Sequence, residues 1–125
     1  MKGEVEVEAD GGLVVARIRG EPSAEILREC QERVLALVRE AGSGRVLYDT
    51  RAMESPASPE IPWFQRELDA QLGEIRLRRA IVVPDSRLAY LARLAFGTGD
   101  YRVFYEDLDA AERWLRADDD ASLAR

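Results

Sequence analysis

The chain has 125 residues, of which 46% are hydrophobic and 34% are charged, the balance of a single soluble globular domain. Its 18 basic and 24 acidic side chains give a net charge of -6, and no run of residues is long and apolar enough for a membrane span, so we expect neither a nucleic-acid partner nor a membrane protein. Histidine is absent and Cys30 is the only cysteine, which excludes Ser-His-Asp and Cys-His mechanisms, an internal disulfide and a multi-thiolate zinc site; we expect no cofactor.

The first twenty residues predict a β-hairpin. Residues 4–9 and 13–19 alternate polar and apolar side chains on either side of the turn sequence Asp10-Gly-Gly12. If residues 10 and 13 flank the turn, both faces agree on one register. That register places Val5 opposite Ile18, Val7 opposite Ala16, Glu4 opposite Arg19 and Glu6 opposite Arg17. We interpret the two arginines as a solvated structural pair, with an anion site as the alternative.

A helix is predicted from Pro22-Ser23 to about Ala41, where Gly42-Ser-Gly44 stops it. Helical spacing gathers its apolar side chains on one face, and Cys30 lies in the middle of that face. We therefore interpret Cys30 as a core residue with a suppressed reactivity.

A strand over residues 45–49 leads into a proline- and serine-rich loop, and the next helix is expected to begin at Pro62. Its apolar positions place Trp63 on the opposite, exposed side of this helix. The loop and this tryptophan form the candidate interaction or phospho-switch region. Its residues are Asp49, Thr50, Arg51, Ser55, Ser58 and Trp63.

Two further strand and helix pairs complete the chain. A strand over 79–84 precedes a helix that Asp85-Ser86 begins, and a strand over 101–105 precedes a short helix from Leu108. The arginines clustered at the start of the strand over 79–84, at positions 76, 78 and 79, are expected to be solvated and to complement helix ends. We expect one domain over residues 1–117 and a flexible acidic tail over 118–125.

Carboxylates end three of the strands, at one edge of the predicted sheet. Asp85 and Asp107 stand where helix N-caps are expected, whereas Asp49 opens the long loop and has no helix to cap. The three together could hold a magnesium ion, and this is the basis of a remote alternative, a carboxylate-dependent metal enzyme.

The order of these elements resembles the SpoIIAA-like family of small bacterial proteins, within the STAS/SEC14-like group. The stretches that carry the resemblance are 45–51, 78–85 and 103–115. It implies an α/β fold with a five-stranded mixed sheet, in which the N-terminal hairpin is followed by β-α units in a right-handed superhelix with four helices.

The resemblance also implies a function. Anti-sigma-factor antagonists of this group are switched by phosphorylation of a serine in an Asp-Ser-Ser-Gly-like motif after the central strand. The chain lacks that motif and offers Asp49, Thr50, Ser55 and Ser58 in the comparable region. We predict a cytoplasmic, non-catalytic regulatory or protein-interaction module, whose partner is another protein or a second copy in a homodimer.

The alternative prediction is a SEC14-like protein that binds a small apolar ligand or lipid. The resemblance implies it, because SEC14-like relatives hold lipids near the sheet. A cavity beside the sheet is the structural feature that this alternative requires.

Overall fold

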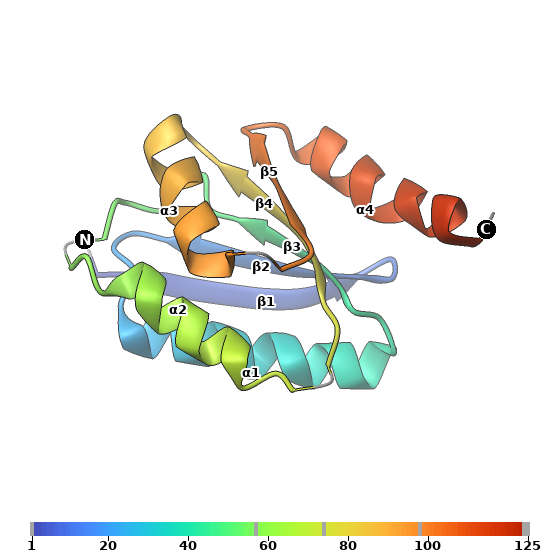
Figure 1. The fold of residues 1–125 in the computed structure, drawn as a ribbon, viewed down its shortest axis with the longest axis horizontal. Helices are drawn as coiled ribbons and strands as arrows, with labels where there is room; N and C mark the ends of the chain where they lie inside the picture. Colours follow the sequence, from blue (N-terminus) through green and yellow to red (C-terminus); the bar gives the residue numbers. More distant parts are fainter. Residues whose placement is uncertain (1, 57, 74, 98, 124–125) are drawn as a thin grey trace.

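Five strands form one mixed sheet whose spatial order, β1-β2-β3-β4-β5, is also their order in the chain (Figure 1). The computed structural model describes residues 2–56, 58–73, 75–97 and 99–123, and for 117–123 the backbone alone. The strands are β1 (Glu4–Asp10), β2 (Leu13–Arg19), β3 (Arg45–Asp49), β4 (Arg78–Val83) and β5 (Tyr101–Tyr105). The helices are α1 (Ala24–Ala41), α2 (Ile61–Ala70), α3 (Ser86–Phe96) and α4 (Leu108–Leu123). The predicted fold class is confirmed.

The β1–β2 hairpin has the predicted register. The strands are antiparallel, and the paired residues are Glu4 with Arg19, Val5 with Ile18, Glu6 with Arg17 and Val7 with Ala16. The two ion pairs described between these strands, however, both join diagonal neighbours and not directly opposite residues. Arg17 Nη1 reaches Glu8 Oε1 at 2.7 Å and Arg19 Nη2 reaches Glu6 Oε1 at 2.8 Å, because long side chains also reach diagonal neighbours.

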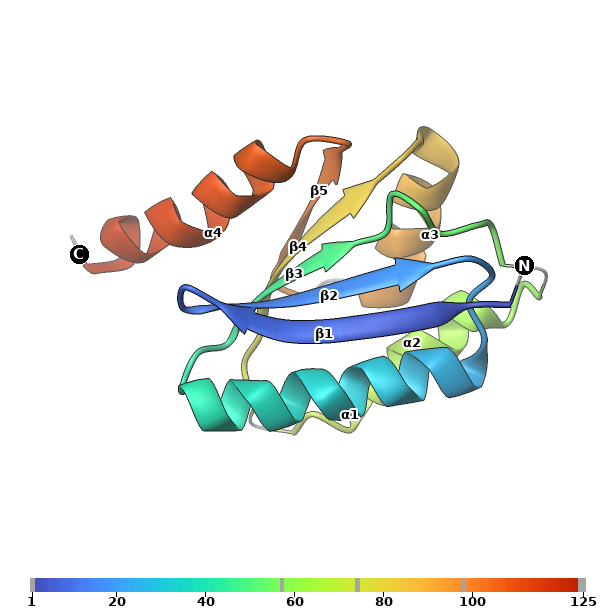
Figure 2. The ribbon, with the colours of Figure 1, turned by 180° about the vertical axis from the view of Figure 1, so that it is seen from behind.

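Alternation along the strands divides the core between two faces of the sheet. Helices α1, α2 and α3 cover one face and α4 crosses the other, as the two opposite views show (Figures 1 and 2). The first face contributes Val14, Ala16, Ile18, Val46, Tyr48, Ile81 and Val83. The second contributes Leu13, Val15, Leu47, Ala80 and Val82, which pack against Ala111 and Leu115. A sheet covered on both faces explains the unbroken apolar runs Val46-Leu-Tyr48 in β3 and Ala80-Ile-Val-Val83 in β4.

Helix α1 begins and ends at the predicted signals, whereas other helix ends differ from the prediction. Ser23 Oγ accepts a hydrogen bond from the Ile26 N–H at 3.2 Å, and Gly42 ends α1 in the left-handed conformation with φ 67°. Helix α2 begins at Ile61, one residue before the predicted start. Helix α4 continues to Leu123, beyond the predicted end. Residues 124–125 and the side chains of 117–123 lie outside what the structure describes, so the flexible tail stays a prediction.

Arg79 is the clearest departure from the sequence-based expectation. Instead of being solvated, it is buried on the face under α2 and α3, with only 3% of its surface exposed. Its guanidinium donates two hydrogen bonds to the Asp69 carboxylate, at 2.9 and 2.8 Å, and lies 4.4 Å from the centre of the Phe96 ring. A buried arginine needs such a partner, and Asp69 is ten residues earlier in the chain on a different element.

Candidate functional site

Asp49 lies at the carboxyl end of β3 and is held by Arg51. The Arg51 Nε and Nη2 atoms donate hydrogen bonds of 2.9 and 3.0 Å to the two carboxylate oxygens, and the Arg51 backbone N–H donates another of 3.2 Å. Only 8% of Asp49 is exposed, although 42% of the Arg51 side chain is. The pair therefore presents a guanidinium to solvent and hides its carboxylate.

The ion pair decides the protonation state of Asp49. Burial of the carboxylate raises its pKa, but the hydrogen bonds from the Arg51 side chain and backbone more than offset this and leave the pKa below its ordinary value. Asp49 is consequently a charged structural group at neutral pH. It lacks the raised pKa that a general acid would need.

Thr50 faces the interior and takes no part in the exposed surface. It is 5% exposed, and its hydroxyl donates a 2.7 Å hydrogen bond to the Val82 carbonyl. The residues that follow are tied to the end of β2, since Gly20 N–H donates to the Ala52 carbonyl and Glu54 N–H donates to the Gly20 carbonyl. The first part of the loop is thus fixed to the sheet.

The two loop serines have different surroundings. Ser58 lies at the start of α2, where its hydroxyl oxygen accepts a hydrogen bond from the Glu60 N–H at 3.2 Å and its carbonyl accepts one from the Ile61 N–H at 3.4 Å. Ser55 lies earlier in the loop, and both serines are partly exposed. The hydroxyl of Ser58 is therefore placed beside the amino end of a helix.

Trp63 is exposed, as its position on α2 predicts. About half of its surface, 49%, is accessible, and the Arg66 guanidinium lies over its ring, 4.9 Å from the ring centre. Arg66 is a partner that we did not predict, although the three-residue spacing on a helix indicates it. No hydrogen bond, ion pair or ring contact within residues 2–56 and 58–73 joins this pair to Asp49 or Arg51.

The other two strand-end carboxylates are helix caps. Asp85 Oδ1 accepts a hydrogen bond from the Leu88 N–H and Asp107 Oδ1 accepts one from the Ala110 N–H, both at 2.9 Å. Among the residues that the structure describes, no three acidic or thiol groups lie close enough to hold a metal ion. The arrangement on which the metal-enzyme alternative depends is therefore not formed.

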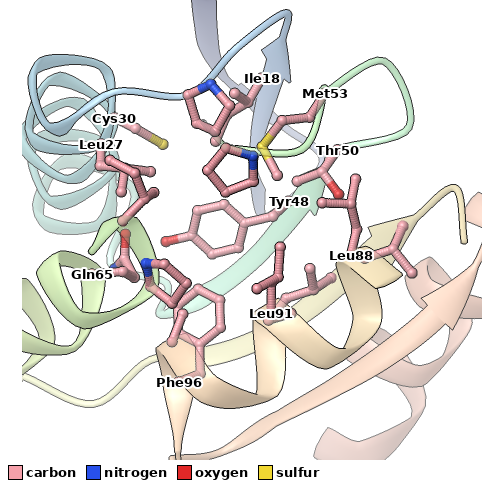
Figure 3. Close-up of a pocket in the computed structure, with 18 of the residues that line it drawn as sticks. Ile18, Leu27, Cys30, Tyr48, Thr50, Met53, Gln65, Leu88, Leu91 and Phe96 are labelled. Carbon is pink, nitrogen blue, oxygen red and sulfur yellow. The ribbon is translucent and has the colours of Figure 1, made fainter. Parts of the chain in front are cut away.

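A cavity of about 80 Å³ lies between the sheet and helices α1, α2 and α3. Figure 3 shows the Tyr48 ring across its middle. The walls are mostly aliphatic, and three prolines at positions 22, 56 and 62 belong to the segments that border it. The sequence does not reveal this cavity, because its walls come from β2, β3, β4, three helices and the loop after β3.

Two titratable groups line the cavity. Burial raises the pKa of the Cys30 thiol to about 12, and burial also raises the pKa of the Tyr48 hydroxyl, against the opposing effect of Arg79. Both groups are therefore neutral at physiological pH. They make the cavity a neutral, largely apolar environment, which is unsuited to acid-base catalysis.

Comparison with known proteins gives a consistent picture of the fold. A family model described as SpoIIAA-like matches residues 13–116. The anti-sigma factor antagonist SpoIIAA, solved in its unphosphorylated form, superposes with a TM-score of 0.62 at 12% identity, covering 90% of this chain and 98% of that one. An anti-sigma factor antagonist from Mycobacterium paratuberculosis superposes with a TM-score of 0.64 at 20% identity, covering 92% of this chain and 95% of that one.

A third solved structure belongs to an uncharacterised protein from Shewanella loihica PV-4 with a SpoIIAA-like fold. It superposes with a TM-score of 0.58 at 21% identity, covering 90% of this chain and 93% of that one. No curated protein sequence matches the chain. In the described part of the chain, no helix has the length and apolar character needed to cross a membrane.

Proposed function

The chain belongs to the SpoIIAA-like family, and from this we propose that it is a non-catalytic regulatory module that binds a protein partner. The proposed contact surface, which we call the loop surface, consists of Arg51, Ser55, Ser58, Trp63 and Arg66. Two solved structures of the same fold are described as anti-sigma factor antagonists, and proteins of that description act on other proteins. We place the module in the cytoplasm, as the sequence predicts.

The half-exposed Trp63 is the observation that carries the proposal. Tryptophan and arginine are the residue types that most often dominate the energy of protein interfaces, and here they are stacked on each other. The stacking holds the tryptophan ring in place before a partner arrives, which lowers the entropic cost of binding. Arg51 adds an exposed positive charge whose position is fixed by Asp49.

A comparison of surface variants tests this function. Tagged wild-type protein and the variants Trp63→Ala and Tyr90→Ala are used to recover partners from the native host, which are then purified and titrated calorimetrically. Tyr90 is the matched control, because it is 61% exposed but lies on α3. We expect one defined partner whose affinity falls at least about tenfold for Trp63→Ala and stays unchanged for Tyr90→Ala. Equal affinity for all three proteins would refute the loop surface.

We further propose that binding is controlled by phosphorylation of Ser58. Its hydroxyl lies at the amino end of α2, where the helix dipole stabilises a phosphate, and the modification adds about -1.5 to -2 charges. In a protein of net charge -6, this addition would repel an acidic partner. Mass spectrometry of protein from its native host should find a phosphate that Ser58→Ala removes and Ser55→Ala retains. A loop without phosphate under every growth condition would exclude the switch.

The cavity supports a second candidate function, the binding of a small apolar ligand. Its volume of about 80 Å³ exceeds the space that a single water molecule needs, and its walls are mostly aliphatic and aromatic. A drug-sized ligand needs several times this volume, so only a small molecule or the end of an alkyl chain fits. Native mass spectrometry after gentle extraction would reveal such a ligand as added mass. Uniformly ligand-free protein, together with no response to added short-chain alcohols, would exclude this function.

A further inference from the structure

The outer edge of β5 has backbone groups without a backbone partner among residues 2–56, 58–73, 75–97 and 99–123. β5 is the last strand in the sheet order, and among the residues that the structure describes it pairs with β4 alone (Figures 1 and 2). The Glu106 N–H donates to the Val83 carbonyl and the Asp100 carbonyl accepts from the Arg79 N–H. The backbone N–H and C=O groups of successive strand residues point to opposite sides of the strand. The even-numbered residues of β5 therefore form their backbone hydrogen bonds with β4. Tyr101, Val103 and Tyr105 therefore direct their N–H and C=O groups outward.

The two edges of the sheet are protected to different degrees. β1, at the other end of the order, carries four carboxylates, and the Arg33 guanidinium donates a 3.4 Å hydrogen bond to its Val5 carbonyl. Charged side chains of this kind prevent a sheet edge from pairing with another chain. β5 reads Tyr-Arg-Val-Phe-Tyr and has a single charge, at Arg102. Its last residue, Tyr105, is 52% exposed.

The sequence of β5 is complementary to itself in the antiparallel direction. A register centred on Val103 places Val103 opposite the same residue of a second copy, and Tyr101 opposite Tyr105. These are the residues with outward backbone groups, so each of these pairs could exchange both hydrogen bonds. Arg102 then faces Phe104, a favourable contact of the kind that these residues already make within one chain, at 5.4 Å from the ring centre.

We propose that two copies of this chain associate through β5, antiparallel and centred on Val103, to form one continuous sheet. A twofold axis perpendicular to the sheet relates the copies, which leaves both α3 helices on one face and both α4 helices on the other. The occupant is a second copy, because an unrelated extended peptide would match the hydrogen bonds but not these side-chain pairs. The proposal does not depend on the loop surface, which lies on other elements.

Sedimentation equilibrium over a range of concentrations tests this dimer with charge variants at its axis. The average mass of the wild type should rise with concentration from 14.0 kDa toward twice that value. Val103→Lys and Val103→Glu each place like charges opposite each other, so each variant alone should stay monomeric. An equimolar mixture should again dimerise, since lysine then faces glutamate. Val103→Thr, which adds no charge, is the matched control and should dimerise.

Circular dichroism spectra of the variants should match the wild-type spectrum, which would show that each variant is folded. Hydrogen exchange on the wild type supplies a second measurement that needs no substitution. Protection of the Val103 and Tyr105 amides should increase with protein concentration, whereas the Phe104 amide, which faces β4, should not change. A wild type that stays monomeric up to roughly 1 mM, or a dimer that Val103→Lys leaves intact, would overturn the proposal.

Discussion

The Arg51 guanidinium holds both carboxylate oxygens of Asp49, a residue two positions away, at 2.9 and 3.0 Å. The Arg51 backbone N–H binds the same carboxylate, so one side chain fixes both the direction of the chain after β3 and the position of an exposed positive charge. The β3–α2 loop begins here, so the pair fixes the first residues of that loop at the end of the sheet.

Replacing Asp49 with asparagine should lower the free energy of unfolding at pH 7 by about 1 kcal/mol. The loss is smaller than for a fully buried ion pair, because solvent partly screens the exposed Arg51 guanidinium. The folded-state pKa of Asp49 is depressed, so its contribution is complete above the unfolded pKa of about 3.9 and disappears as the pH falls through the folded value. Urea denaturation at pH 7 and pH 3 should therefore show a difference between the wild type and Asp49→Asn that shrinks on acidification. A difference independent of pH would contradict this interpretation.

Replacing Asp69 with asparagine should be far more damaging. The Arg79 side chain is 4% exposed and that of Asp69 16%, so the variant leaves a buried guanidinium without its counter-charge, at a cost of about 3 kcal/mol. Asp100→Asn is the control, since its pair with Arg78 has a carboxylate that is 58% exposed and should contribute less than about 1 kcal/mol. Chemical denaturation of both variants measures the difference. Equal effects would show that burial does not set the strength of these pairs.

The hairpin register and the helix caps were predictable because each depends on residues close together in the sequence. Alternation on both strands fixes the pairing of Val5 with Ile18, and a serine or aspartate before an apolar stripe indicates a cap. The exposure of Trp63 followed from helical spacing in the same way.

The buried Arg79–Asp69 pair and the cavity were not predictable, because each joins elements that are separate in the chain. Arginine is mostly exposed in folded proteins, and here the packing of α2 and α3 over this face buries Arg79. The cavity likewise depends on how three helices meet the sheet, for which the sequence has no periodic signal. The Asp49–Arg51 pair is close in sequence, but whether it forms depends on the turn after β3.

The cap interpretation of Asp85 predicts a graded response to substitution. Asp85→Ala removes the acceptor for the Leu88 N–H and should lower the free energy of unfolding by about 1 kcal/mol. Asp85→Asn retains a side-chain oxygen that can accept the same hydrogen bond, and it should lower the free energy of unfolding by only about 0.3 kcal/mol. Thermal and urea unfolding of the two variants provide the comparison. If asparagine were as damaging as alanine, the charge of Asp85 rather than its capping bond would be the important property.

The single thiol should be almost inert in the folded protein. Burial raises the pKa of Cys30 to about 12, so at pH 8 very few molecules carry the reactive thiolate, and only 3% of the residue is exposed. Ellman's reagent should therefore react with native protein only at the rate at which the structure opens, and immediately in denaturant. The Cys30→Ser variant, which has no thiol, is the negative control. A small free thiol such as N-acetylcysteine gives the labelling rate of a fully exposed thiol.

The same labelling experiment reports on the cavity, because Cys30 lines it. A small apolar molecule that occupies the cavity stabilises the closed state and should slow labelling in proportion to its occupancy. Rapid labelling of the native protein at pH 8, comparable with the free thiol, would contradict both the burial of Cys30 and its raised pKa. Labelling that is slow but insensitive to every small apolar additive would leave Cys30 as a core residue and count against the cavity as a binding site.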